Sequence, residues 1–218
     1  EAMVNFLSLL GWNPGNQREK FSLDELVELF DVRRIGRTNA KFDRDKLLAF
    51  NTDAAAAAEE SRLVEGFRDY LQLNPDSPGP IPSDDDELLL RLLRINRGFR
   101  TFADIPARCG VLFAPDNSFD YEDKAVRKVL EKADGAGFKV LEDLREKLPP
   151  EPWTPEGIES FIADYCASNE LGMGKVAQPL RVAVTGGMVS PPIGETLSLL
   201  GRAKTLSRME RCLALPRG

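Results

Sequence analysis

Residues 174–194 read Gly174-Lys-Val-Ala-Gln-Pro-Leu-Arg-Val-Ala-Val-Thr-Gly-Gly-Met-Val-Ser-Pro-Pro-Ile-Gly194, and this stretch decides the fold class. It holds the one candidate in the chain for the period-two alternation of a strand, Arg181 to Thr185, which is too short to found a sheet. A turn at Ser190-Pro-Pro192 follows, and we expect a helix after it. Because apolar residues elsewhere recur at helical spacing, the sequence predicts an all-α fold, a helical bundle or cage in two or three pieces.

Local signals place the helix starts and the breaks. Ser22 is followed three residues later by Glu25, which is the pattern of a capping box. Asn74 to Pro82 contains four prolines and one glycine, and Leu148-Pro-Pro-Glu-Pro152 interrupts the chain again. Thr154 and Pro155 then restart a helix as N-cap and first helical residue. Helices are predicted at 2–12, 22–31, 84–96, 101–107, 121–134 and 137–147, and others after Thr154, after Pro192 and around 206–213.

One helix boundary stays open at this point. A helix begins near Asp43, and the alanine run Ala54 to Ala58 is a good helix former, so this helix either ends there or continues to Tyr70. The acids of residues 84–87 directly precede an apolar run, where the positive end of the helix dipole favours them. We therefore interpret them as a helix start and expect no metal site in the chain.

Composition limits the function. The chain has 218 residues, a net charge of −6 and 29% charged residues, which argues against a protein that coats nucleic acid through bulk charge. It has no histidine, the commonest general base and a frequent zinc ligand, so we expect no catalytic residue. Three widely spaced cysteines indicate neither a disulfide framework nor a metal site, and we expect a soluble, cytoplasmic protein without a membrane span.

Two segments near the start carry specific motifs, Val4-Asn-Phe-Leu-Ser-Leu-Leu-Gly-Trp-Asn-Pro14 and Phe21-Ser-Leu-Asp-Glu-Leu-Val-Glu-Leu-Phe30. Together with residues 174–194, they resemble bacterial glutamyl-tRNA synthetases. The match is close at 4–50 and 174–213, while 75–165 agree mainly in helical pattern and in Arg100-Thr101. The resemblance implies a stem-contact domain at 1–66 and two helical anticodon-binding subdomains at 67–148 and 149–218.

The resemblance also implies site residues. Family members read the anticodon with an arginine at the start of a Leu-Arg-x-Ala-x-Thr-Gly element and with residues around the following Ser/Thr-Pro turn. An arginine offers a planar fork of donors, and the turn is expected to offer apolar surface to unstacked bases. Some relatives carry an aromatic residue where Gly194 stands, and Met188 is a candidate replacement. The implied anticodon-binding residues are Arg181, Ser190, Pro191, Pro192, Ile193 and Gly194.

A second set of cations is implied more weakly. These side chains would contact tRNA phosphates or bases: Arg37, Lys41, Arg94, Arg97, Arg100, Lys204 and Arg208. Which arginine of residues 94–100 inspects the third anticodon base stays open. Without the resemblance, a purely structural role for these residues would be preferred to RNA binding, or would be equally well supported. The 190–192 turn would then cap the next helix, and Arg181 would pair with an acid. Arg91, Arg94 and Arg97, which are spaced to lie near one face of a helix, would form surface ion pairs with the acids of 84–87 and 120–123.

The family's ATP-binding elements, His-x-Gly-His and Lys-Met-Ser-Lys-Ser, do not occur in this sequence. The resemblance therefore implies recognition without catalysis. We expect no cofactor in this chain, with ATP and Mg belonging to the intact enzyme. The expected partner of this monomer is tRNA-Glu, with tRNA-Gln left open, and we expect binding to neither DNA nor a membrane. Two alternatives remain, a free-standing tRNA-binding or regulatory paralogue and a helical protein-interaction scaffold.

Overall fold

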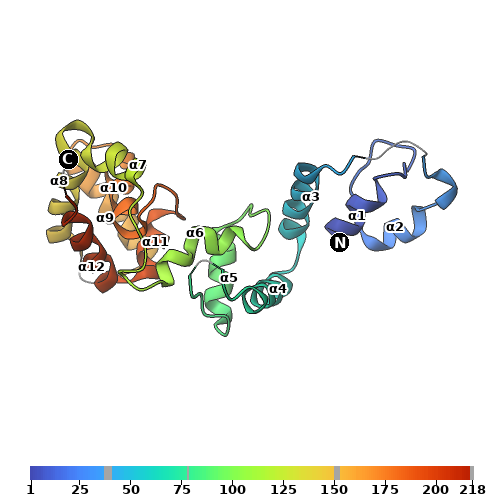
Figure 1. Ribbon diagram of the computed structural model, residues 1–218, viewed down its shortest axis with the longest axis horizontal. Coiled ribbons are helices and arrows are strands. Elements are labelled where there is room, and N and C mark those ends of the chain that lie inside the picture. Colours follow the sequence, from blue (N-terminus) through green and yellow to red (C-terminus); the bar gives the residue numbers. More distant parts are fainter. Residues whose placement is uncertain (37–40, 78, 150–152, 217–218) are drawn as a thin grey trace.

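The helices form three groups in a row, with the N-terminus in the first group and the C-terminus in the last (Figure 1). The computed structural model describes residues 1–36, 41–77, 79–149 and 153–216. Within these ranges every regular element is a helix, and a single isolated bridge joins Trp12 to Ile35. The all-α prediction is confirmed. None of the described helices has the length and apolar character needed to cross a bilayer.

The first group, called the N-terminal segment, contains α1 (Ala2–Ser8), α2 (Leu23–Leu29), the 3-10 turn η1 (Val32–Arg34) and α3 (Arg44–Ala57). The predicted capping box at the start of α2 is confirmed. The Glu25 amide donates to Ser22 Oγ at 3.1 Å, and the Ser22 amide donates to Glu25 Oε2 at 2.8 Å. The core cluster of this segment is small and consists of Trp12, Phe21 and Leu26, while Phe6 and Phe50 are buried outside that cluster.

The second group, called the middle lobe, contains α4 (Glu60–Leu73), α5 (Asp86–Ile95) and α6 (Asp104–Phe113). Asp85 caps α5 by accepting the Leu88 amide at 2.9 Å, as the acidic run predicted. The helix that begins near Asp43 ends at the alanine run and does not continue to Tyr70, because Ala58 is extended, with ψ 149°, and separates α3 from α4. Alanine side chains have little apolar surface to bury, so intrinsic propensity alone does not hold a continuous helix there.

The third group, called the C-terminal lobe, contains α7 (Asp123–Ala125), the π-helix η2 (Val126–Glu131), α8 (Lys132–Lys147), α9 (Pro155–Ser168), α10 (Met173–Thr185), α11 (Ile193–Leu200) and α12 (Arg202–Leu213). The predicted N-cap is confirmed, since Thr154 Oγ1 accepts the Gly157 amide at 3.1 Å. Residues 181–185, the candidate strand, lie in α10. Near the predicted helix break, Ala133, Asp134 and Gly135 have positive φ values of 54°, 57° and 70°.

The hydrophobic cores do not divide the chain where the sequence placed its domain boundaries. The middle-lobe core begins at Val64, inside α4, so a boundary at residue 66 cuts a helix. The expected boundary at 148 is also displaced, because Phe138, Leu141 and Leu144 of α8 are buried in one core with α9 to α12. The proline-rich break at 148–152 interrupts the helix without separating the cores, so the C-terminal core begins at about residue 125.

Gly137 of α8 allows the chain to fold back on itself at the kink. A Cβ atom at this position would lie 2.3 Å from the Val129 carbonyl oxygen and 2.7 Å from Leu130 Cα, both backbone atoms of η2. A side chain at this position would therefore push two helical backbones apart.

We predict that Gly137→Ala lowers the free energy of unfolding of the C-terminal lobe by about 1 to 3 kcal/mol. The matched control is Gly174→Ala in α10, where a Cβ meets nothing within 4 Å and alanine should stabilise the helix by about 0.5 to 1 kcal/mol. Urea denaturation followed by Trp153 fluorescence, in a common Trp12→Phe background, measures both. Equal midpoints for the two variants would contradict this account of the kink.

Candidate nucleic-acid interface

The loop between α10 and α11 is held in one shape by backbone contacts. Gly186 ends α10 in the left-handed region, with φ 77°, and its amide donates to the Val182 carbonyl. A Cβ there would lie 2.2 Å from the Asp120 carbonyl oxygen, so only glycine fits. The Glu122 amide donates to the Gly186 carbonyl at 2.9 Å. The loop is therefore fixed against residues 114–122, called the linker because they join the middle and C-terminal lobes.

Arg181 lies against this loop and is held by hydroxyl and carbonyl groups. Its Nε donates to Ser190 Oγ at 2.8 Å, and its Nη2 reaches the Pro191 carbonyl at 3.4 Å. Buried Thr196 supports both, since its Oγ1 lies 3.0 Å from Ser190 Oγ and donates to the Pro191 carbonyl at 3.1 Å. The explanation by an acid partner is wrong, because within the described ranges Arg181 forms no ion pair and its Nη1 has no hydrogen-bond acceptor.

This environment keeps the Arg181 fork ready for an acceptor. The side chain is half-buried, and burial lowers the pKa of its guanidinium below its ordinary value. A guanidinium remains charged at neutral pH even so. Its partners are neutral, so they orient the group without cancelling its charge. A half-desolvated arginine with one free terminal nitrogen is suited to hydrogen bonding with the edge of an unstacked base.

Three of the residues expected to contact RNA are buried in this structure. Pro191 and Ile193 are buried, and Ile193 belongs to the C-terminal core. Gly194 is buried against α9, where a Cβ would lie 2.6 Å from the Pro155 carbonyl oxygen, so an aromatic residue does not fit. Because α11 begins at Ile193 and packs on α9, its first residues face the core.

The exposed residues of this loop are not Pro191, Ile193 and Gly194 but their neighbours. Pro192 is exposed, Ser190 and Met188 are half-buried, and Val189 is 72% exposed. Sequence reasoning missed Val189. The only signal for it was an apolar residue placed directly before the Ser-Pro turn. The apolar surface that was expected of this turn is therefore provided by Val189 and Pro192.

The middle-lobe arginines differ in how free they are. Arg94 makes a two-pronged pair with Glu60, with Nε–Oε1 at 2.8 Å and Nη2–Oε2 at 2.6 Å, and this hydrogen bond lowers the pKa of Glu60. Arg97 and Arg100 are exposed, and neither forms an ion pair within the described part of the chain. Arg97 lies with Arg94 at a cavity of about 220 Å³ between α3, α4 and α5. The acid that pairs with Arg94 is therefore Glu60, and not one of the acids expected at 84–87 and 120–123.

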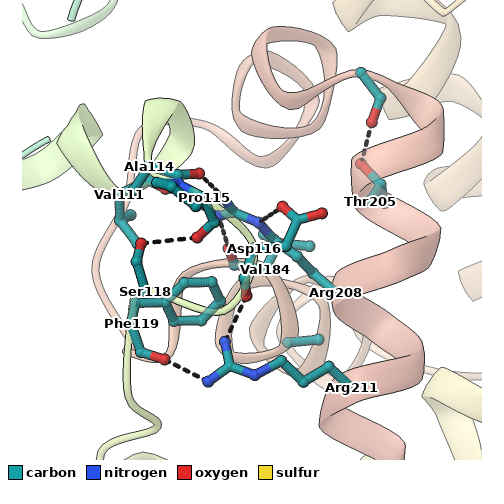
Figure 2. Close-up of polar contacts among 12 residues, drawn as sticks. Val111, Ala114, Pro115, Asp116, Ser118, Phe119, Val184, Thr205, Arg208 and Arg211 are labelled. Atoms are coloured by element: carbon teal, nitrogen blue, oxygen red, sulfur yellow. Dashed lines mark hydrogen bonds and ion pairs between the residues drawn. The ribbon is translucent and has the colours of Figure 1, made fainter. Parts of the chain in front are cut away.

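Among the remaining candidate cations, Arg208 does not face solvent as its expected contact with RNA requires. Its side chain is fully buried, and Figure 2 shows its guanidinium turned toward Val111, Ala114, Asp116 and Val184, so it is not available for contact with RNA. Arginine is rarely fully buried, so the burial of this side chain was not expected from the sequence. Lys204 and Lys41 are exposed, as expected. Arg37 lies outside the described residues.

Comparison with known proteins agrees with this architecture. The middle and C-terminal lobes define an anticodon-binding domain, because a family model with the description "Anticodon binding domain" matches residues 62–213, and the chain belongs to that family. Among curated relatives, glutamate–tRNA ligase 1 of Alkalilimnicola ehrlichii is 37% identical over 98% of this chain and 43% of the relative. Glutamate–tRNA ligase of Geotalea uraniireducens is 32% identical over 100% of this chain and 44% of the relative.

The matched region is the C-terminal part of those ligases, and the chain spans less than half of their length. A crystal structure of a glutamate tRNA ligase from Elizabethkingia meningosepticum aligns with a TM-score of 0.81. It covers 98% of this chain and 40% of that chain at 23% identity, a likeness that shows the fold. The resemblance to glutamyl-tRNA synthetases is thereby confirmed.

The pair between Arg208 and Asp116 makes stability depend on pH. Burial raises the pKa of Asp116, but the hydrogen bond and charge of Arg208, with contributions from Ser207 and Lys204, outweigh burial and hold it below the ordinary 3.8. A carboxyl whose folded pKa is lowered stabilises the fold above its unfolded pKa and loses this contribution as pH falls through the folded value.

We therefore predict that Asp116→Asn is less stable than the original protein at neutral pH, and that the difference shrinks on acidification. Free energies of unfolding measured between about pH 6 and pH 2 check this. A difference that stays constant over that range would contradict the assignment of the charge pair.

Proposed function

We propose that this chain is the tRNA-recognition part of a glutamate–tRNA ligase and that it binds the anticodon arm of tRNA-Glu. The observation that carries the proposal is the Arg181 fork, held by Ser190 and the Pro191 carbonyl with Nη1 left without an acceptor in the described ranges. The match to the anticodon-binding family supports it, as do the printed names of the curated relatives.

Charge explains how an acidic protein binds RNA. The net charge is −6, so affinity must come from local cations, and two candidate arginines are paired with acids, Arg94 with Glu60 and Arg208 with Asp116. Arg97 and Arg100 on the middle lobe and Arg181 on the C-terminal lobe form no ion pair with the residues that the structure describes. Few phosphate contacts give a shallow salt dependence, while hydrogen bonds to base edges give specificity.

In the intact ligase, binding energy at the anticodon would orient the distant acceptor end, a use of remote contacts to position reacting groups. The chemical step would belong to the rest of the ligase, with its ATP and Mg. This chain would supply recognition alone, as a cytoplasmic monomer without affinity for DNA or membranes. The proposal leaves open whether tRNA-Gln is also accepted.

The central prediction concerns specificity for the anticodon. The 218-residue chain should bind a tRNA-Glu transcript more tightly than a transcript differing only in its anticodon, by about 1 to 3 kcal/mol per changed base in contact. Filter binding or fluorescence anisotropy at several salt concentrations measures affinity and salt slope together. Undetectable binding to every transcript would instead favour a protein-interaction scaffold, and equal affinity for all transcripts would reject anticodon reading.

A second prediction separates the effect of the positive charge of Arg181 from that of its planar fork of donors. Arg181→Ala should weaken binding to tRNA-Glu by about 1 to 3 kcal/mol. Arg181→Lys keeps the positive charge but loses the planar fork, so it should lose discrimination between anticodons while its salt slope stays close to that of the original protein. A folded Arg181→Ala variant with unchanged affinity would remove this residue from the site.

A further inference from the structure

One guanidinium connects the ends of two helices that belong to different lobes. Arg208 Nη1 donates to the Val111 carbonyl at 2.9 Å, and Nη2 donates to the Ala114 carbonyl at 2.8 Å; Val111 lies in the last turn of α6 in the middle lobe, and Ala114 caps that helix at the start of the linker. Nη1 also donates to the Val184 carbonyl at 2.8 Å, at the end of α10 in the C-terminal lobe. Nε donates to Asp116 of the linker at 2.8 Å (Figure 2).

This arrangement is suited to holding the lobes together. The last carbonyls of a helix have no partner within the helix and carry the negative end of its dipole, so a cation is favoured there. Arg208 satisfies carbonyls at the ends of α6 and α10 at once. Because buried carbonyls without a donor are costly, moving one helix end away from the other would sacrifice several charge-assisted hydrogen bonds.

Arg211, one turn further along α12, fastens the linker itself. Its Nη1 donates to the Asp116 carbonyl at 2.7 Å and its Nη2 to the Phe119 carbonyl at 2.5 Å (Figure 2). Its guanidinium carbon lies 4.6 Å from the centre of the Phe119 ring and 5.1 Å from that of Tyr121, within reach of cation–π attraction. Arg208 lies 4.7 Å from the same Phe119 ring. We call Arg208, Arg211 and their linker partners the clasp.

A second contact joins the same two lobes elsewhere. Arg91 of α5 donates to Glu195 Oε2 of α11 at 2.9 Å through Nε and at 2.7 Å through Nη2, and it also reaches Ser198 Oγ at 2.9 Å. Leu199 of α11 packs against the middle-lobe core. The interface therefore has attachments on α5 and α11 that do not depend on the clasp.

The helices joined by Arg208 are those that carry or follow the candidate RNA-binding arginines. Arg181 lies on α10 one turn before Val184, and Arg97 and Arg100 lie in the turn that leads into α6. The angle between α6 and α10 consequently sets where these arginines lie relative to one another. A rigid angle allows one RNA loop to engage both lobes, and the second contact then gains from a high effective concentration.

We propose that Arg208 and Arg211 are positioning residues, which hold the Arg97–Arg100 surface and the Arg181 loop at the one relative placement where a single anticodon loop contacts both. The inference rests on the proposed function, because it concerns how the same RNA is bound. Neither residue contacts the RNA. Their effect is transmitted through the orientation of α6 and α10.

The test uses the full chain and three variants. Arg211→Ala removes the outer part of the clasp while leaving the four bonds of Arg208, and Arg208→Lys keeps the charge but removes the fork. The matched control is Arg202→Ala on the same helix, because Arg202 donates to the Pro149 carbonyl at 2.9 Å and the Leu148 carbonyl at 3.4 Å, entirely within the C-terminal lobe. If Arg208→Lys does not fold, Arg211→Ala carries the test.

The first measurement is the distribution of distances between spin labels at Gln72→Cys in α4 and Glu146→Cys in α8. The native cysteines, Cys109, Cys166 and Cys212, are all buried, so labelling is confined to the added ones. Arg211→Ala and Arg208→Lys should broaden the distribution, and Arg202→Ala should leave it unchanged. An unchanged distribution in folded Arg211→Ala protein would overturn the proposal.

The second measurement is affinity for a tRNA-Glu anticodon stem-loop. Arg211→Ala should weaken binding by about tenfold or more, the loss expected when two linked contacts become independent, and Arg202→Ala should not. The cost of adding Arg97→Ala should also shrink in the Arg211→Ala background, since the middle lobe would no longer engage together with Arg181. A simple loss of stability would not produce this change in coupling between distant residues.

The outcomes separate this inference from the function on which it rests. If the unaltered chain does not bind the stem-loop, the proposed function fails and the positioning role fails with it, whatever the label distances show. If the chain binds, and Arg211→Ala broadens the distances without changing affinity, the function stands and the positioning role is rejected.

Discussion

The buried guanidinium of Arg208 connects the middle lobe to the C-terminal lobe at the ends of α6 and α10. Removing a full charge from water is costly, and the cost is offset only when all donors find well-placed acceptors. Here three carbonyls and the Asp116 carboxylate provide them. These acceptors come from α6, the linker and α10, so satisfying one side chain fixes three parts of the chain. The rigid loop that holds Arg181 then inherits its position from the same linker, through Gly186 and Glu122.

The protein separates cations that maintain its shape from cations that face solvent. Arg208, Arg211 and Arg91 donate to internal acceptors, and Arg94 is neutralised by Glu60. The remaining arginines of the candidate interface are few and lie on two lobes. In a chain with a net charge of −6, nonspecific attraction of polyanions is weak. Recognition must then depend on where a small number of donors are placed, which makes rigidity of the frame a condition of specificity.

How much of the candidate site could be predicted differs from residue to residue. The grouping of Arg181 with Ser190 was expected from the family resemblance alone, and the structure places the two side chains 2.8 Å apart. The burial of Ile193 and the exposure of Val189 could not be predicted, because both depend on how α11 packs against α9, a contact between segments about 35 residues apart. The burial of Arg208 is a stronger case, since its acceptors lie as far as 97 residues away along the chain.

The sequence by itself determined the features that rest on local free energies. The capping box of Ser22 and Glu25, the start of α9 at Thr154 and the all-α class depend on residues a few positions apart, where propensity and backbone hydrogen bonding dominate. Only the tertiary structure decided which helices share a core, where the lobes divide and which arginines face solvent. Those outcomes arise from burial and hydrogen bonding between distant segments, and the spacing of residues along one helix carries no information about its partners.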